Sequence, residues 1–519
     1  MLRSALARET AKFRLRRGFA LLLGVLSLAS CREPASRDTR RESPGAAPDQ
    51  PVAARPTQEP ARAPIDVVPE YRLRIDPATH SVEARLEIDL PAPDSIHLLF
   101  RGEWDGYPGL ESRLRRLEAW GPSGALPVAM GAGQLGPAHH IVEATHAERV
   151  TVAFTTVLTP PQESHFYHRA SQLDADGGHL LGADLLPRVW VGAPRHGPQR
   201  ARLWFSGMPG SWRVATIERR AGTGYETEDI MDAVFVVGRL RTHRQSLGPR
   251  SLTTAIHGRW PVPDERVVNA VNQIAGALHR IASDGWAGGD HLLGAGRVPP
   301  RIPGLSTGGQ VIGKSAIVYV GGSGPGELEF QRWMYTTAHE LLHWYIPTAF
   351  RFRGTQPSWF AEGFTDYVAL KTLLVGELIA PQNFLDEIAA RLTRYRESPL
   401  YGERSIAEAQ ADFWEDDVYR YIYDGGAAAA FLLDLGFQDR GGSLERALKE
   451  ARRGTHVSQE SLTAALGTVP ENEWIQDWLT NGANPDWDER LERYRLVWRN
   501  GRLVSLDGWA TDVLSSIRP

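Results

Sequence analysis

The 519-residue chain has one cysteine, Cys31, so it cannot form a disulfide bond within itself. It also lacks a strong excess of either charge, because 58 Lys and Arg residues stand against 62 Asp and Glu residues. The basic surplus lies in residues 1–64, which leaves the remainder mildly acidic. Proteins that bind nucleic acid concentrate positive charge, so nucleic acid is not an expected partner.

The sequence also lacks long apolar runs. The apolar run at the N-terminus is shorter than a helix that spans a bilayer. Lys12, Arg14, Arg16 and Arg17 are basic, residues 19–28 are apolar, and the stretch ends in Leu28-Ala29-Ser30-Cys31. This order is typical of a secretory signal peptide, here residues 1–30, and Arg16-Arg17 leaves both Sec and twin-arginine export open. The last four residues resemble a bacterial lipobox. The resemblance implies that Cys31 is lipidated and anchors the chain to a membrane of the cell envelope.

Residues 31–64 hold seven prolines and few large apolar side chains. A segment of this composition cannot bury enough apolar surface to fold, because its conformational entropy is not offset. We therefore expect a semi-rigid tether between the lipidated cysteine and the folded part of the chain.

From residue 65 the sequence alternates between apolar and polar residues, as half-buried antiparallel strands do. Residues 71–75 and 82–90 show this best, on either side of a turn at 76–79. Further strands are expected at 96–101, 149–157, 200–206 and 233–238. We predict a β-sandwich-like domain over residues 65–250 that carries no catalytic residues.

Two patterns in this region imitate binding motifs without the context that such motifs need. Residues 131–136 match G-x-G-x-x-G, but they have no strand–helix frame and no acidic residue about 20 positions later. Four histidines lie nearby, and no carboxylate or thiol shares a regular spacing with them. We interpret these as surface or structural histidines: His139, His140, His165 and His168.

The strongest chemical pattern is His339-Glu340-Leu341-Leu342-His343, an H-E-x-x-H motif in an apolar segment. Positions i and i+4 of a helix share one face, so the two imidazoles can bind one zinc ion with Glu340 beside them. The helix is expected to end before Pro347. Upstream, residues 264–282 predict an amphipathic helix and residues 310–320 predict a strand.

A catalytic zinc needs a third protein ligand, and Glu362 is the candidate. Ser358 is expected to cap a second helix, which would place Glu362 opposite the first helix. Asp366 lies one turn later, where it could accept a hydrogen bond from a ligating histidine and fix its tautomer.

H-E-x-x-H followed by residues 344–361 and then Glu362 in a W-F-x-E-G-x-x-x-Y setting resembles the gluzincin metallopeptidases. It is most similar to the glycyl aminopeptidase family and, more distantly, to the aminopeptidase N family. The resemblance implies a thermolysin-like catalytic domain over residues 251–370. It also implies His339, His343 and Glu362 as zinc ligands, Glu340 as general base, and a peptide or protein as substrate.

Two further family features are partly present. Tyr423 takes the place of the tyrosine that stabilises the tetrahedral oxyanion, with Tyr421 as the fallback and Gly425 where the family usually has lysine. Gly308-Gly309-Gln310 resembles the strand at the edge of the substrate cleft. The family's next residue is a glutamate that anchors the substrate amino terminus, and Val311 stands there. Glu327 and Glu329 remain open as substitutes.

Residues 371–519 have helical periodicity over most of their length and predict an α-helical lobe, with helices expected at 384–396, 406–423, 427–435, 444–452, 458–466 and 473–479. Only about forty residues follow residue 479, too few for the PDZ domain that the family often carries. The expected fold is therefore an α+β multidomain protein without a PDZ domain.

Three functions stay open for this fold. The first is an aminopeptidase, and the second is an endopeptidase or another exopeptidase, which Val311 favours. The third is a peptide-binding lipoprotein with a vestigial zinc site.

Overall fold

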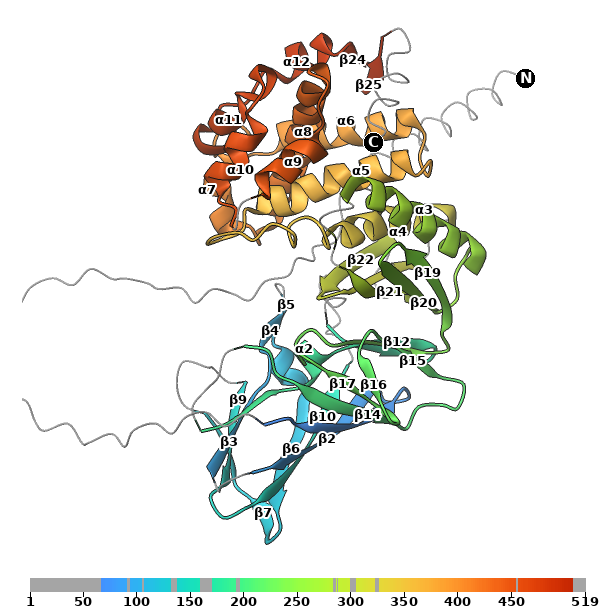
Figure 1. Ribbon diagram of the computed structural model, residues 1–519, viewed down its shortest axis with the longest axis vertical. Coiled ribbons are helices and arrows are strands. Elements are labelled where there is room, and N and C mark those ends of the chain that lie inside the picture. The colour runs from blue at the N-terminus through green and yellow to red at the C-terminus, as the bar shows by residue number, and fades with distance from the viewer. Residues whose placement is uncertain are drawn as a thin grey trace, which may run out of the picture.

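The computed structural model describes residues 67–506, except 91–93, 105–106, 132–137, 159–169, 193–196, 283–285, 287, 299–304, 323–325 and 454–455. The expected signal peptide, Cys31 and the tether lie outside the described residues. So do His165, His168 and most of the G-x-G-x-x-G stretch. The described chain is a mixed α+β multidomain protein, which confirms the predicted class (Figure 1).

The N-terminal domain is built from three sheets around one apolar core. Alternation of buried and exposed side chains along β1 and β2 turns one sheet face toward that core. The largest sheet has the order β16-β17-β14-β1-β2-β10-β6-β7. Its strands are β1 (Glu70–Asp76), β2 (Ser81–Asp89), β6 (Leu114–Gly121), β7 (Gly124–Leu126), β10 (Arg149–Val157), β14 (Ala201–Ser206), β16 (Arg219–Ala221) and β17 (Gly224–Thr227).

Two four-stranded sheets complete this domain, in the orders β13-β3-β9-β8 and β11-β12-β18-β15. Their strands are β3 (Asp94–Leu99), β8 (Val128–Met130), β9 (His139–Ala144), β11 (Gln172–Asp174), β12 (Gly177–Leu181), β13 (Arg188–Val191), β15 (Arg213–Ala215) and β18 (Val234–Gly238). Short elements lie between them: β4 (Glu103–Trp104), β5 (Tyr107–Pro108), η1 (Leu110–Arg113) and α2 (Gly182–Leu185). The strands predicted from alternation in this region are thus confirmed to within about two residues at their ends.

A five-stranded sheet follows, with the order β19-β20-β21-β23-β22. Its strands are β19 (Arg241–Leu247), β20 (Arg250–His257), β21 (Gly289–Val298), β22 (Leu305–Ile312) and β23 (Ser315–Gly322). The sheet therefore begins before residue 251, where the catalytic domain was expected to start. The single strand predicted over residues 310–320 was wrong. A turn at Gly313, whose φ is +54°, folds that stretch into the antiparallel hairpin β22–β23.

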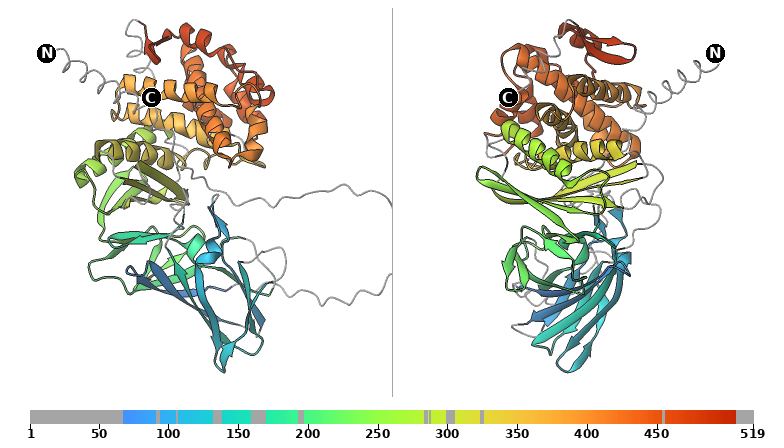
Figure 2. Two further views of the ribbon diagram at one scale, coloured as in Figure 1. Left: turned by 180° about the vertical axis from the view of Figure 1, so that it is seen from behind. Right: turned by 90° about the vertical axis from the view of Figure 1, so that its right-hand side faces the viewer.

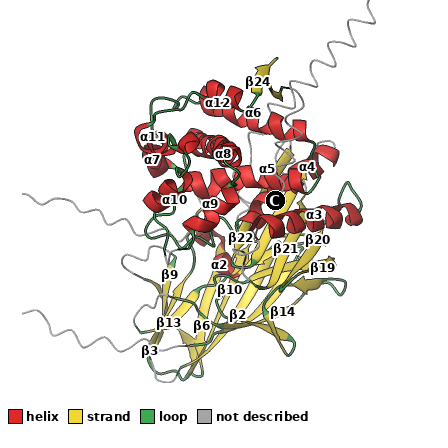
Figure 3. Ribbon diagram, turned by 45° about the horizontal axis from the view of Figure 1, so that its top comes forward, coloured by secondary structure: helices red, strands yellow, loops and turns green. Residues whose placement is uncertain are grey.

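Helices cover one face of this sheet and continue into a helical lobe (Figure 2). α3 (Asp264–Ala282) matches its predicted range, and α4 (Gly326–Leu342) packs on β22 and β23. The lobe consists of η3 (Trp359–Phe364), α5 (Thr365–Val375), α6 (Pro381–Glu397), α7 (Ile406–Ala409), η4 (Gln410–Asp412), α8 (Asp416–Asp439), α9 (Leu444–Ala451), α10 (Gln459–Leu466), η5 (Pro470–Asn472), α11 (Ile475–Asn481), α12 (Trp487–Arg493) and the hairpin β24 (Leu496–Arg499) with β25 (Arg502–Ser505). Helices and strands are largely segregated to opposite ends of the molecule (Figure 3).

One helix of the lobe differs from its prediction. Residues 406–423 were expected to form one helix and residues 427–435 another. Instead the chain breaks after η4, and α8 runs without interruption through Gly425 and Gly426. Glycine disfavours a helix by about 1 kcal/mol, but both faces of α8 are buried here, and tertiary packing outweighs that preference.

Two apolar clusters connect the parts of the molecule. The larger runs from Leu252 to Leu503, so the sheet β19–β23 and the helical lobe share one core. A smaller cluster joins β12 and β18 of the N-terminal domain to β23. In the described part of the chain we find no helix of the length and apolarity that crossing a membrane requires.

Candidate active site

The H-E-x-x-H sequence lies at the buried C-terminal end of α4. α4 ends at Leu342, earlier than the expected end before Pro347. The turn that follows is narrower than an α-helical turn. The backbone N–H of His343 donates to the carbonyl oxygen of Glu340, 3.1 Å away. The Nδ1 atom of His343 lies 2.9 Å from the carbonyl oxygen of Ile346, which can only accept. Nδ1 therefore carries the proton, and Nε2 presents its lone pair to the site.

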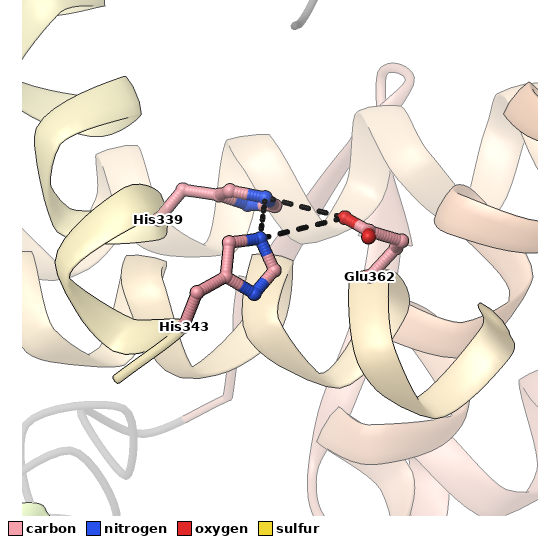
Figure 4. A group of neighbouring side chains, drawn as sticks. All are labelled: His339, His343 and Glu362. Atoms are coloured by element: carbon pink, nitrogen blue, oxygen red, sulfur yellow. Dashed lines mark hydrogen bonds and ion pairs between the residues drawn. The ribbon is translucent and has the colours of Figure 1, made fainter. Parts of the chain in front are cut away.

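Glu362 approaches from η3, a π-helical segment that leads into α5. Such segments displace side chains from regular helical positions and recur at functional sites. The cap expected at Ser358 was wrong, because Ser358 is already helical and its side chain makes no cap hydrogen bond. The π turn, rather than a capped first turn, aims Glu362 at the two imidazoles (Figure 4).

The three side chains converge on one point. The Nε2 atoms of His339 and His343 are 3.1 Å apart, and the Oε2 atom of Glu362 lies 3.4 Å from the first and 3.7 Å from the second. Two ligands at about 2.0–2.1 Å from a tetrahedral zinc would themselves be about 3.3 Å apart. Two imidazoles and one carboxylate are also the ligand types of a catalytic zinc site. The residues present fit the ion.

The charges around the site favour a cation. Burial would lower the pKa of His339, but hydrogen bonds to Asp366 and Glu362 outweigh that effect and raise it to about 10. For His343 burial dominates, and its pKa falls to about 4. One positive charge is thus stabilised among the carboxylates, and a metal ion bound by Nε2 of both rings would take the place of that proton.

Asp366, in the first turn of α5, orients His339. Its Oδ1 atom lies 2.8 Å from Nδ1 of His339, so the carboxylate receives the ring proton and directs Nε2 toward Glu362. Burial would raise the pKa of Asp366, but the Arg391 guanidinium and His339 lower it to about 2. Asp366 therefore stays ionised across the neutral pH range.

Glu340 is fully buried and lies against the edge strand β22. A Cβ atom built on Gly309 would be only 2.4 Å from Cγ of Glu340. The strand can pass this close to the carboxylate only because residue 309 has no side chain. The expected edge residues Gly308, Gly309 and Gln310 are all on β22, beside the ligand helix α4.

Of the two candidate tyrosines, only Tyr423 contacts the candidate metal ligands. Its hydroxyl donates to Oε2 of Glu362 at 2.6 Å, and its ring stacks on that of His339 with centroids 6.2 Å apart. Tyr421 points elsewhere, because its hydroxyl donates to the carbonyl oxygen of Arg404 at 2.8 Å. The geometry therefore favours Tyr423 over the fallback.

A lysine at position 425, the residue that the family resemblance implies there, would not fit this chain. A Cβ atom on Gly425 would be 2.6 Å from the ring of Tyr395. The next residue, Gly426, packs against the backbone of η3, so that a Cβ atom there would be 2.5 Å from the carbonyl oxygen of Trp359. Sequence reasoning missed this glycine contact, although Gly363 in the W-F-x-E-G stretch was the signal for it.

None of the three residues considered as a partner for the amino terminus of a substrate is placed for that role. Val311 is 4% exposed and belongs to the large apolar core. Glu327 is paired with Arg266 at 2.7 Å, and Glu329 with Arg297 at 3.1 Å. Both glutamates sit in the first turn of α4, about 15 Å or more along the helix from His339.

The histidines that the structure describes in the N-terminal domain do not form a comparable site. His139 stacks on Trp190, and His140 contacts Phe100 edge-on. Among the residues that the structure describes, only His339, His343 and Glu362 form a group of possible ligands whose atoms all lie within 4.8 Å of one another.

Comparison with known proteins agrees with this geometry. Residues 332–427, which span the ligands and Tyr423, match the family model described as M61 glycyl aminopeptidase. No curated protein sequence is similar enough to match the chain. The sequence match thus covers the site and not the whole chain.

Solved structures extend the likeness to the fold. An aminopeptidase N family protein from Idiomarina loihiensis has a TM-score of 0.69 at 17% identity, over 83% of this chain and 79% of that one. An M1 zinc metallopeptidase variant from Deinococcus radiodurans, bound to a Tyr-Ser-Ala substrate, has a TM-score of 0.47 at 15% identity, over 82% and 96%. The first of these establishes a shared fold.

Proposed function

We propose that this chain, a gluzincin zinc peptidase, hydrolyses peptide bonds with His339, His343 and Glu362 as its metal ligands and Glu340 as its general base. The observation that carries the proposal is the convergence of three ligand atoms in a buried site, from α4, the turn that follows it, and η3. A chance H-E-x-x-H sequence on an amphipathic helix would not face a third buried ligand. We interpret the sheet β19–β23 with α3, α4, η3 and α5 as a thermolysin-like catalytic domain, closed by the rest of the helical lobe from α6 onward.

Zinc in such a site acts as a Lewis acid and makes water acidic enough to attack a carbonyl at neutral pH. The carboxylate of Glu340 accepts a proton from the attacking water and returns it to the amine of the leaving peptide. Asp366 holds the proton of His339 at Nδ1, which keeps Nε2 available as a ligand atom. β22, with Gly308, Gly309 and Gln310, binds the substrate backbone as an added strand.

Tyr423 is the candidate hydrogen-bond donor to the oxyanion. Its hydroxyl donates to Glu362 and can turn to the oxyanion that develops during attack. We therefore assign oxyanion stabilisation to Tyr423.

The first candidate activity is that of an aminopeptidase, which the description of the matching family supports. The second is that of an endopeptidase, and the burial of Val311 favours it. A substrate ammonium group drawn out of water needs a paired carboxylate, and valine offers none. Cleavage of the peptide bond at the zinc site does not depend on this residue.

We also propose that the enzyme works at the bacterial cell envelope, attached through a lipid on Cys31. The support is the order of basic residues, apolar residues and Leu28-Ala29-Ser30-Cys31 in the sequence. Radiolabelled palmitate should be incorporated into the chain in bacteria and should be lost from a Cys31→Ala variant. Label retained by that variant would contradict the assignment.

A peptide library tests the activity and its mode together. Half of the peptides carry a free amino terminus and half are N-acetylated, and products are read by mass spectrometry. Trimming restricted to free amino termini indicates an aminopeptidase, whereas internal cuts or cleavage of acetylated peptides indicate an endopeptidase.

The Glu340→Gln variant is the control for this experiment. It removes the base and keeps the shape of the side chain, so we expect it to retain zinc and lose turnover. Retained turnover would refute the role of Glu340. Zinc binding by the parent chain without cleavage of any peptide would instead support a non-catalytic peptide-binding protein.

A further inference from the structure

Arg391 of α6 is a fully buried guanidinium that the catalytic steps above do not use. Its Nη2 atom lies 3.3 Å from Oδ2 of Asp366 and 2.5 Å from the hydroxyl of Tyr335, and its Nη1 atom lies 3.1 Å from Glu387 on its own helix. The guanidinium also lies over the Tyr335 ring, 5.2 Å from its centroid. Three contacts from three helices hold this one cation.

Two of these contacts reach the segments that carry the metal ligands. Tyr335 is one helical turn before His339 on α4, so the two side chains share a face of that helix. Asp366 is one turn after Glu362 and hydrogen-bonds His339 directly. The guanidinium therefore ties α4, which carries His339 and leads into His343, to the segment that carries Glu362.

We propose that Arg391 is a positioning residue that presets the ligand triad through Asp366. The inference rests on zinc binding by His339, His343 and Glu362, which is part of the proposed function. Arg391 contacts one carboxylate oxygen of Asp366 and leaves the other for Nδ1 of His339. With Oδ2 held, the carboxylate cannot rotate away from the ring, so Nε2 stays directed at the ligand site.

Arginine suits this task better than lysine. Its planar fork presents donors in fixed directions and serves Asp366 and Tyr335 at once, whereas an ammonium is a point charge on a flexible stem. Burying a cation is costly unless it is paired and hydrogen-bonded, and Arg391 meets that condition with side chains from three helices. A lysine in its place would keep the charge and lose the geometry.

The test is the affinity of the full chain for Zn²⁺, measured by competition with a chelating dye after metal removal. The zinc content of the parent chain is measured first, because a parent that binds no zinc would refute the metal site itself. Loss of an outer partner of a metal ligand typically lowers metal affinity by about 10- to 100-fold. We expect a loss of that size for Arg391→Gln and a smaller loss for Arg391→Lys.

A buried ion pair elsewhere on α5 provides the matched control. Lys371 pairs with Asp434 at 2.7 Å and is as deeply buried as Arg391, but its hydrogen bond and ion pairs go to Asp434 and Glu445 and not to Asp366 or Tyr335. Lys371→Met should lower the denaturation midpoint of the metal-free chain and leave its zinc affinity close to that of the parent. Parent-like zinc affinity in Arg391→Gln, with a similar stability loss, would reduce Arg391 to a packing residue and overturn the proposal.

A double variant tests the route through Asp366. If Arg391 acts through that carboxylate, Asp366→Asn combined with Arg391→Lys should bind zinc no more weakly than Asp366→Asn alone. Additive losses would show that Arg391 affects the ligands by another path and would contradict the inference. The Arg391→Lys change keeps the buried charge, so this arm remains informative where Arg391→Gln fails to fold.

Discussion

Gly426 of α8 lies directly against Gly363 of η3, so that a Cβ atom built on Gly363 would be 2.5 Å from Cα of Gly426. The two glycines let the backbones of these helices meet without side chains between them. Glu362 precedes one glycine and Tyr423 is one turn before the other, and their side chains meet at 2.6 Å. The approach of the two helices thus determines where the proposed oxyanion donor stands relative to a proposed ligand.

Gly426→Ala should separate the two helices. The added methyl group would meet the carbonyl oxygen of Trp359 at 2.5 Å, and this backbone atom cannot turn aside as a side chain can. Overpacking of this kind costs about 1–3 kcal/mol of unfolding free energy. We expect weaker zinc binding together with a lower urea midpoint.

Gly276→Ala on α3 is the matched control for that substitution. Gly276 is also a helical glycine, and a Cβ atom there would meet only the end of Arg280, 4.0 Å away. Replacing an unhindered helical glycine by alanine stabilises by about 0.5–1 kcal/mol. Equal effects at residues 276 and 426 would mean that helix propensity, and not the contact with η3, decides both.

Tyr423→Phe should lower turnover while zinc stays bound. Removing one oxyanion donor costs about 10²- to 10³-fold in kcat, and the ring itself is kept. Tyr421→Phe, two residues away on the same helix, removes a buried hydroxyl that bonds only outside the site and should leave turnover close to that of the parent. Zinc loss in Tyr423→Phe would mean that the hydroxyl mainly holds Glu362 in place.

The group of candidate metal ligands could be anticipated from the sequence because its spacing is a local property of the chain. His339 and His343 are four residues apart, so they lie on one face of any helix that contains both. The residues between His343 and Glu362 are enough for the chain to turn and place a second helix opposite the first. Tyr423 is sixty-one residues beyond Glu362, and its choice over Tyr421 depends on the rotation of α8. Only the packed helices determine that rotation.

Contacts between distant segments were the ones that the sequence left unspecified. Arg391 has no motif around it, and its partners on α4 and α5 lie 56 and 25 residues away. The hairpin β22–β23 was merged into one strand because apolar residues, Val311-Ile312 at the end of β22 and the core of β23, lie on both sides of a turn of only Gly313-Lys314. α8 was divided because Gly425 and Gly426 suggest a break, and the burial that favours helix there is a tertiary effect.

The boundary between the N-terminal domain and the five-stranded sheet should lose stability in acid. His179 of β12 is 2% exposed and stacks on Tyr319 of β23, and burial lowers its pKa to about 4. The unfolded chain takes up a proton near pH 6.5 and the folded chain only near pH 4, so the unfolded state binds more protons between these values. The contribution of His179 is therefore complete above about pH 6.5. It falls by up to about 1.4 kcal/mol per pH unit as the pH drops toward 4.

Urea unfolding at a series of pH values between 7.5 and 4.5 measures this loss. His179→Gln, which keeps a donor for the carbonyl oxygen of Ala170, should be less stable at pH 7.5 but should show a flatter pH dependence. The exposed His243 of β19 provides the control, and His243→Gln should leave the slope unchanged. His257 is buried nearby with its pKa lowered to about 3, chiefly by burial, so part of the slope should survive in His179→Gln. A slope identical to that of the parent would mean that His179 does not contribute to acid sensitivity, and that His257 or the carboxylates of the domain account for it.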